Sequence, residues 1–154
     1  MNLADVARQT DEATARARAE LVSAVRRAAA SGMTQAQIAE QIGRSQPEVS
    51  RLLRFHGTSP LARRLRRHSA DVRRIVAEYG GSNVRVFGSV ATGDDRPNSD
   101  VDLVFTMGRP LSLLELGRLE QRLTAVLEVE VDAVPDSTLR PELKERILAE
   151  AITL

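Results

Sequence analysis

Apolar residues in the first part of the chain recur at the spacing of a helix. The pattern predicts a helix over residues 11–30 that ends at Ser31-Gly32, because glycine commonly follows the last helical turn. The apolar positions recur near a period of 3.6 residues, which is typical of an amphipathic helix: Ala13, Ala17, Leu21, Val25 and Ala28.

Two short helices are predicted next, over residues 35–42 and 46–54. Thr34 and Ser45 are suited to cap them, and Gly43 supplies the turn between them. Two short helices joined by a glycine-containing turn are typical of a helix-turn-helix. Residues 33–53 closely resemble the helix-turn-helix domains of bacterial repressors.

By that resemblance, residues 46–54 form the recognition helix, whose first side chains enter the major groove. Glutamine can pair with adenine there and arginine with guanine. The expected DNA-binding residues are Gln35, Ser45, Gln46, Pro47, Ser50, Arg51 and Arg54. Such proteins usually bind DNA as dimers, for which residues 1–30 could supply an interface. The alternative is a three-helix structural or protein-binding module without DNA contacts.

Residues 55–60 break the helical pattern at Gly57 and Pro60. A basic amphipathic helix is predicted over 61–79, before Gly80-Gly81. Its four arginines at 63, 64, 66 and 67 either contact phosphates or an acidic partner, or form a solvated helix face.

After Gly81 the pattern alternates between strands and helices, which predicts a small mixed α/β layer. Strands are expected at 83–87, 101–107 and 128–134, and helices at 111–127 and 139–152. The second strand is continuously apolar after Asp102, which indicates burial on both faces. The core stripe of the 111–127 helix is expected to contain Leu113, Leu114, Leu116, Leu119, Leu123 and Leu127.

Charge divides the chain into two unequal halves. Residues 1–80 hold 14 Arg and 8 Asp or Glu, a net charge of +6, whereas residues 81–154 carry a net charge of −5. A basic half suits a polyanion and an acidic half suits a metal or a basic partner, although both could be solvated surface. The absence of cysteine excludes disulfides and thiol catalysis. No run is apolar enough for a signal peptide or a membrane span, so we expect a cytoplasmic protein.

The candidate chemistry lies between the first two strands of the acidic half. Gly88-Ser89 follows the strand at 83–87, ten residues separate Ser89 from Asp100, and Asp102 comes two residues later. Residues i and i+2 of a strand share a face, so two carboxylates would lie side by side and repel one another unless a cation intervenes. A later strand places Asp132 where it can join them. Three carboxylates suit one or two Mg²⁺ ions, and Gly-Ser at a helix start suits phosphate.

This pattern of Gly-Ser, ten residues, Asp-x-Asp and a later strand Asp resembles the minimal nucleotidyltransferases of the DNA polymerase β superfamily. The resemblance covers roughly residues 65–154. It implies that Gly88 and Ser89 contact the triphosphate of ATP, that Asp100 and Asp102 bind Mg²⁺, and that Asp132 is a third metal ligand or the base for the acceptor hydroxyl. One departure is Thr92, where many of these proteins have arginine.

The resemblance implies an α+β chain with two domains: an all-α helix-turn-helix domain at 1–58 and a small mixed α/β nucleotidyltransferase domain at 59–154. Many small relatives are antitoxins that transfer AMP from ATP to a tyrosine of a HEPN-type toxin, and a helix-turn-helix suggests autoregulation of the operon. Two alternatives stay open. One is a non-enzymatic regulator whose degenerate domain only binds nucleotide or toxin, and the other is an enzyme that modifies a small molecule such as an aminoglycoside.

Overall fold

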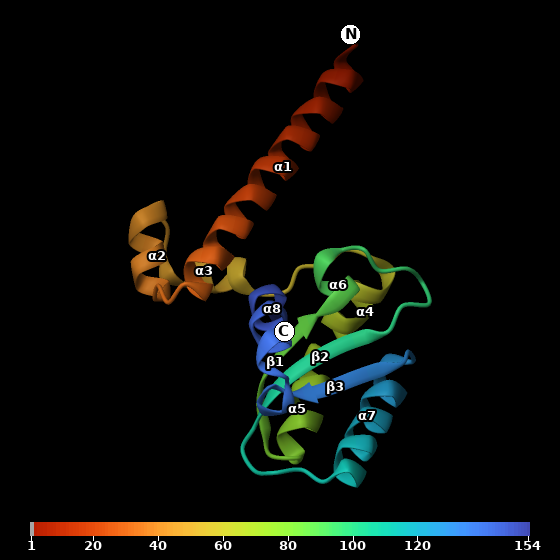
Figure 1. The fold of residues 1–154 in the computed structure, drawn as a ribbon. Coiled ribbons are helices and arrows are strands. Elements are labelled where there is room, and N and C mark those ends of the chain that lie inside the picture. The colour runs from red at the N-terminus through yellow and green to blue at the C-terminus, as the bar shows by residue number, and fades with distance from the viewer. Residues whose placement is uncertain (1) are drawn as a thin grey trace. The chain divides into compact units, whose positions relative to one another are not determined.

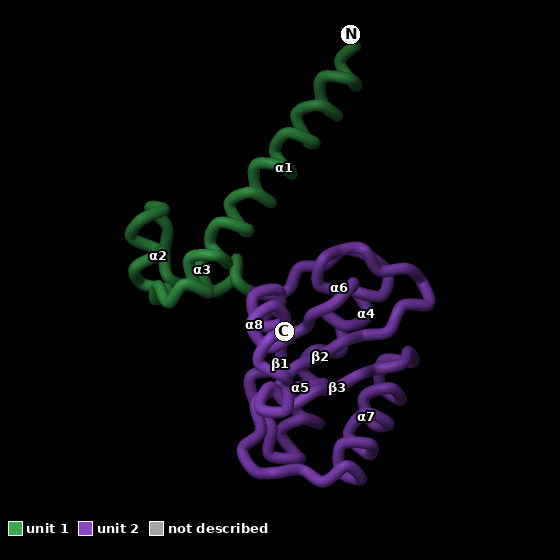
Figure 2. The backbone as a smooth tube through the Cα atoms, viewed as in Figure 1, with its two compact units in different colours: residues 1–53 green, residues 54–154 purple. Residues whose placement is uncertain are grey.

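The computed structural model describes residues 2–154 and divides into two compact units, residues 1–53 and 54–154 (Figure 2). The sequence placed the boundary at residue 58. Residues 54–58 belong to the second unit because the Phe55 N–H donates to the Thr153 carbonyl at 2.8 Å. Among residues 2–154, no helix is both long and apolar enough to cross a membrane.

The first unit contains three helices, α1 (Leu3–Ala30), α2 (Gln35–Ile42) and α3 (Gln46–Leu53) (Figure 1). Helix α1 begins earlier than predicted because Asn2 caps it. The Asp5 N–H donates to Asn2 Oδ1 at 2.9 Å, and the Asn2 N–H donates to Asp5 Oδ2 at 3.3 Å. The predicted pattern did not include this capping box, which extends the helix through a segment with few apolar residues.

Helices α2 and α3 begin at the predicted capping residues. The Gln37 N–H donates to Thr34 Oγ1 at 3.2 Å, and the Glu48 N–H donates to Ser45 Oγ at 3.3 Å. Gly43 ends α2 in the left-handed conformation, with φ at +66°, which glycine adopts without strain. The unit has a small apolar core of its own: Val25, Ile38, Ala39, Val49 and Leu52.

The second unit is built on a four-stranded mixed sheet with the strand order β3-β2-β1-β4. β1 pairs antiparallel with β2 and β4, and β2 pairs parallel with β3. The strands are β1 (Gly81–Phe87), β2 (Val101–Met107), β3 (Val131–Pro135) and β4 (Ile152–Thr153). The helices are α4 (Pro60–Arg67), α5 (Ser69–Glu78), α6 (Gly88–Thr92), α7 (Leu113–Leu127), α8 (Pro141–Glu150) and the 3₁₀ turn η1 (Asp136–Thr138).

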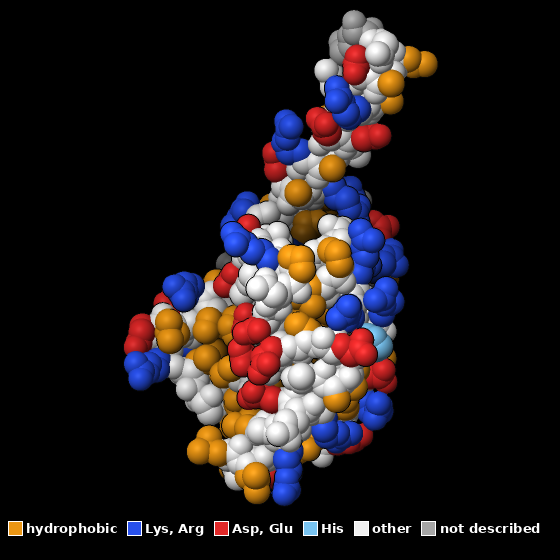
Figure 3. All heavy atoms as spheres, turned by 90° about the vertical axis from the view of Figure 1, so that its right-hand side faces the viewer, with side chains coloured by type: hydrophobic (Ala, Val, Ile, Leu, Met, Phe, Trp, Pro, Cys, Tyr) orange, Lys and Arg blue, Asp and Glu red, His pale blue; other side chains and the backbone are white. Residues whose placement is uncertain are grey.

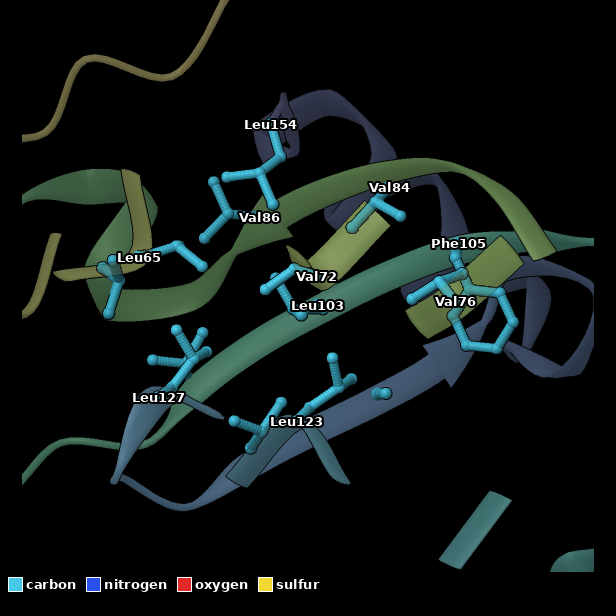
Figure 4. Packing of buried hydrophobic residues seen from close by; sticks show 14 of the residues in the cluster. Leu65, Val72, Val76, Val84, Val86, Leu103, Phe105, Leu123, Leu127 and Leu154 are labelled. Carbon is cyan, nitrogen blue, oxygen red and sulfur yellow. The ribbon is translucent and has the colours of Figure 1, made fainter. Parts of the chain in front are cut away.

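Helices α4, α5 and α7 share one apolar core with alternate residues of the sheet (Figure 4). Residues i and i+2 of a strand share a face, so Leu103 and Phe105 of β2 face this core together with Val86 of β1. Helix α8 contributes no buried residue to this core and contacts β1 and α6 instead. Asp102, Val104 and Thr106 therefore lie on the opposite face of β2.

Several details of the predicted elements are wrong. The strand expected at 128–134 begins only at Val131, because Glu128 ends α7 in the left-handed conformation, and the helix expected at 139–152 spans Pro141–Glu150. The helix expected at 61–79 is two helices, because His68 leaves helical geometry at φ −101° and ψ 13°. The helix expected at 111–127 begins at Leu113, where Ser112 caps it, so its first leucines precede the buried stripe. Leu113 and Leu114 are 89% and 65% exposed. β4 was not predicted, since two residues give no periodicity.

Candidate active site

Gly88 stands where β1 ends and α6 begins, and it approaches Asp102 closely. Its φ is +72°, and a Cβ atom placed on it would overlap the Oδ2 atom of Asp102. A side chain at position 88 is thus disfavoured by backbone conformation and by space. The Gly-Ser turn predicted from the sequence therefore lies beside one of the predicted carboxylates.

The sheet register brings Asp102 and Asp132 together. In the parallel ladder of β2 and β3, Asp102 pairs with Asp132, and in the ladder with β1 it pairs with Phe87, the residue before Gly88. Residues paired across a sheet project from the same face. Asp100 precedes the first residue of β2 and is exposed, as is Asp132, whereas Asp102 is partly buried.

The electrostatics of Asp102 show that the carboxylates act on one another. Loss of solvation, together with the charges of Asp132, Asp100 and Glu150, raises the pKa of Asp102 to about 6. Burial also raises the pKa of Glu120 on α7, with Asp132 contributing. The sequence pattern gave no sign of Glu150 or Glu120, because nothing in their local spacing indicates proximity to β2 and β3.

The donor set suits Mg²⁺ in its chemistry. Carboxylate oxygens are the ligands that Mg²⁺ prefers, and burial together with the neighbouring negative charges raises the pKa of Asp102. Within residues 2–154, no three acidic, histidine or cysteine side chains are close enough together to form a complete metal site. The described aspartates therefore do not enclose a metal ion by themselves, and Mg²⁺ usually takes several of its ligands from substrate phosphate and water.

Thr92, the departure from the expected arginine, is engaged locally. Its hydroxyl donates to Asp94 Oδ2 at 3.1 Å and lies 3.3 Å from the Ser89 carbonyl and 3.4 Å from the Gly88 carbonyl. Ser89 lies in the first turn of α6 and is partly buried. The Thr92 side chain thus fastens the end of α6 to the loop that leads to Asp100.

A second polar group supports the same face of the sheet and was not predicted. Asp136 Oδ2 accepts hydrogen bonds from Arg85 Nη2 at 3.0 Å and from Thr106 Oγ1 at 2.9 Å. Burial opposes ionisation of Asp136, but these hydrogen bonds outweigh it and hold the pKa of the carboxyl below its ordinary value. The Arg85 and Asp136 side chains are only 14% and 21% exposed, so the pair joins β1, β2 and η1.

Three arginines of α4 donate hydrogen bonds to backbone carbonyl groups. Arg63 Nε donates to the Thr58 carbonyl at 2.8 Å, Arg64 to the Leu127 carbonyl at 3.3 Å, and Arg66 to the Gly57 carbonyl at 3.3 Å. Arg63 and Arg66 therefore support the loop before α4, and Arg64 supports the C-terminal end of α7.

The residues predicted to contact DNA lie on or next to α2 and α3. Gln46, Pro47 and Arg51 are exposed on α3, whereas Ser50 is partly buried, and Gln35 is exposed at the start of α2. Ser45 is exposed, and its hydroxyl accepts the capping hydrogen bond of α3. Arg54 follows the last residue of α3 and forms a backbone bridge with Thr153 in the second unit.

The sequence model of the nucleotidyltransferase domain matches residues 66–154, which include the Gly-Ser turn and all three aspartates. The chain therefore belongs to the nucleotidyltransferase domain family. The sequence-based prediction of an enzyme of this class is confirmed at the level of the family.

Relatives agree with this assignment. One relative is MJ0435 of Methanocaldococcus jannaschii, which is named provisionally as a protein adenylyltransferase. It is 38% identical over 78 residues, which cover 51% of this chain and 84% of that protein. Protein adenylyltransferase MntA of Thermococcus cleftensis is 32% identical over 84 residues, covering 54% of this chain and 85% of that protein.

Solved structures share the fold. One described provisionally as a minimal nucleotidyltransferase is 39% identical, with a TM-score of 0.56, and the match covers 64% of this chain and all of that one. A toxin–antitoxin structure with AMP-PNP matches with a TM-score of 0.51 at 20% identity, covering 55% of this chain and 69% of that chain. At that identity, the second match speaks for the fold alone.

Proposed function

We propose that the second unit is a Mg²⁺-dependent protein adenylyltransferase, which moves AMP from ATP to a tyrosine hydroxyl of a partner toxin and so acts as an antitoxin. The observation that carries the proposal is the juxtaposition of Gly88 with Asp102, and of Asp102 with Asp132, inside the matched family region. Relatives named protein adenylyltransferases support the reaction. A neighbour of the same fold comes from a toxin–antitoxin pair, which suggests the acceptor.

The residues divide the work of the reaction. Gly88 leaves room for phosphate beside Asp102, and Ser89 offers its hydroxyl and N–H to the triphosphate. Asp100, Asp102 and Asp132 would hold Mg²⁺, which neutralises phosphate charge when bound. Asp132, exposed at the neighbouring strand, would act either as the third of these ligands or as the base that accepts the proton of the acceptor hydroxyl. The acceptor oxygen bonds to the α-phosphorus, the bond from that phosphorus to the bridging oxygen breaks, and pyrophosphate leaves.

The test uses α-labelled ATP, Mg²⁺ and the protein encoded beside this chain. We expect label on a tyrosine of that protein and release of pyrophosphate. Asp102→Asn should abolish both, while Glu145→Gln, which changes an exposed carboxylate of α8, should leave both unchanged. Binding of the partner without pyrophosphate release would overturn the proposal and favour a non-enzymatic regulator.

We propose that the first unit binds operator DNA through α3, so that the antitoxin regulates its own expression. Exposed Gln46 and Arg51 at the predicted recognition helix support this role. Arg51→Ala should weaken binding to the specific operator by about 1–3 kcal/mol, with little change on scrambled DNA. Arg16→Ala, on α1, is the control. Equal losses on both DNAs would make Arg51 a phosphate contact, and no loss would refute its role.

A further inference from the structure

Among residues 2–154, nothing packs against the first two-thirds of α1. Every residue from Val6 to Glu20 is exposed, and Leu3 is 85% exposed. In Figure 3 hydrophobic side chains appear along this helix between charged ones. An isolated helix gains little stability in water, because most helical stability in proteins comes from packing of one face. The exposed segment thus lacks the contact that such a helix normally has.

The side chains of α1 are segregated around the helix. Nine charged residues lie in α1, and all of them avoid one sector of about 120°, as judged from the helical repeat. The seam at the centre of this sector has spacings that alternate between four and three, the repeat that lets two helices stay in contact along their length. Its members are Leu3, Ala7, Thr10, Thr14, Ala17, Leu21, Ala24 and Ala28.

Val6, Gln9, Thr10, Ala13, Thr14 and Ala17 line a shallow groove that follows this sector and extends past its edge at Gln9. Small side chains let a second helix approach closely, because interhelical distance depends on the residues at the contact. The sector carries too few large apolar residues for a membrane-surface helix, which buries Trp, Phe or Leu. The occupant that fits is therefore another helix with small residues of its own.

We infer that α1 pairs antiparallel with α1 of a second copy of this chain, with Thr14 of each copy opposite Ala17 of the other. In this register Leu21 lies opposite Thr10, so that a large residue meets a smaller one, and Ala7 lies opposite Ala24, where two small residues let the helices approach closely. Leu21 also contacts the core of its own unit, but it is only partly buried there. Ala7 and Ala24 are exposed.

Charge complementarity selects the antiparallel direction. Asp11 and Arg18 flank the seam on the same side, and in this register Asp11 of each copy lies beside Arg18 of the other, which makes two ion pairs by symmetry. Within residues 2–154 neither side chain has an ion pair or hydrogen bond of its own. In a parallel pair the flanking partners of Asp11 and Arg18 would be Val6 and Ala13, without complementary charge.

The pairing rests on α1 alone and does not depend on either proposed activity. If the first unit binds DNA as proposed, the two copies of its core would lie about 30 Å apart along the paired helices. That separation is close to one turn of B-DNA, about 34 Å, which is the usual spacing of half-sites.

Sedimentation of the full-length chain at tens of micromolar tests the inference. The wild type should be a dimer. Ala17→Glu, in the seam, should be monomeric, whereas Ala15→Glu, the same change on the exposed outer face, should remain a dimer. Far-UV circular dichroism checks that both variants keep their helices. A monomeric wild type, or equal behaviour of the two variants, would overturn the pairing.

A charge swap tests the direction of pairing. Asp11→Arg or Arg18→Asp should each weaken the dimer by about 10-fold, since each change replaces two attractive contacts with two repulsive ones. The double variant Asp11→Arg with Arg18→Asp restores opposite charges and should recover the wild-type dissociation constant. Arg16→Asp, on the opposite side of α1, should have little effect. Failure of the double variant to recover would refute the antiparallel register.

Discussion

Asp102 should make the metal-free protein less stable at neutral pH, because its partly buried position and its negatively charged neighbours disfavour the ionised carboxylate. Loss of solvation, with the charges of Asp132, Asp100 and Glu150, raises the pKa of Asp102 from 3.8 to about 6. A carboxyl whose pKa is raised in the folded state favours folding at pH values below its unfolded pKa. It opposes folding once the pH rises through the folded value.

The size of this effect follows from the pKa difference. Each pKa unit corresponds to about 1.4 kcal/mol, which sets an upper value near 3 kcal/mol above pH 7. Because Asp102 is only partly buried, solvent reduces this figure, and we expect about 1–3 kcal/mol. The penalty should shrink to about 0.5 kcal/mol or less at pH 4, near the unfolded pKa.

Asp102→Asn removes the charge with little change in shape. We expect this variant to have a higher free energy of unfolding than the wild type at pH 7.5 and nearly the same value at pH 4. Urea denaturation followed by Tyr79 fluorescence measures it. Tyr79 is the single tyrosine of a chain without tryptophan, and it contacts the core of the second unit, so its signal reports that unit.

Two comparisons complete the experiment. Glu145→Gln should give no difference from the wild type at either pH. Mg²⁺ should raise the stability of the wild type at pH 7.5 and have a smaller effect on Asp102→Asn. A variant that is less stable than the wild type at pH 7.5, or a difference that is the same at both pH values, would show that the charge cluster does not oppose folding.

Three further predictions concern the second unit. Gly88→Ala should destabilise the fold and abolish nucleotidyl transfer, because a methyl group would overlap Asp102. The control is Gly93→Ala, at φ +84° with open space around it, which should lower the free energy of unfolding in urea by only about 1–2 kcal/mol. Similar losses in the two variants would contradict the close approach of Gly88 to Asp102. Asp136→Asn should lower the free energy of unfolding by about 1–3 kcal/mol at pH 7. The difference from the wild type should fade as the pH drops below about 4, because the pKa of Asp136 is lowered in the folded state and the stabilisation by its carboxylate is lost on protonation. A loss that urea titrations find to be independent of pH would count against the ion pair. Ile152→Ala should lower the free energy of unfolding by about 2–4 kcal/mol, because the Ile152 side chain is only 6% exposed. Thr153→Ala should lower it by less than about 0.5 kcal/mol, because Thr153 is exposed. Equal losses on thermal unfolding would refute a packing role for β4.

The sequence by itself determined the parts of this protein that depend on local order. Helix α2 was predicted over its observed residues, because a capping threonine, apolar spacing and a terminal glycine all lie within one short stretch. β2 was likewise predicted over its observed residues from its continuous apolar run. The family could also be inferred, because the Gly-Ser turn and Asp-x-Asp form one contiguous motif with fixed spacing.

Only the tertiary structure decided how separate segments combine. The pairing of Asp102 with Asp132 depends on the parallel register of β2 and β3, and the raised pKa of Asp102 also depends on Glu150, which is 48 positions away along the chain. Arg85 of β1 and Asp136 of η1 form their ion pair between elements that are far apart along the chain. β4 exists because its two residues find hydrogen-bonding partners on β1. Side-chain patterns report the faces of single elements, whereas charge coupling and strand register arise from distances that only the folded chain sets.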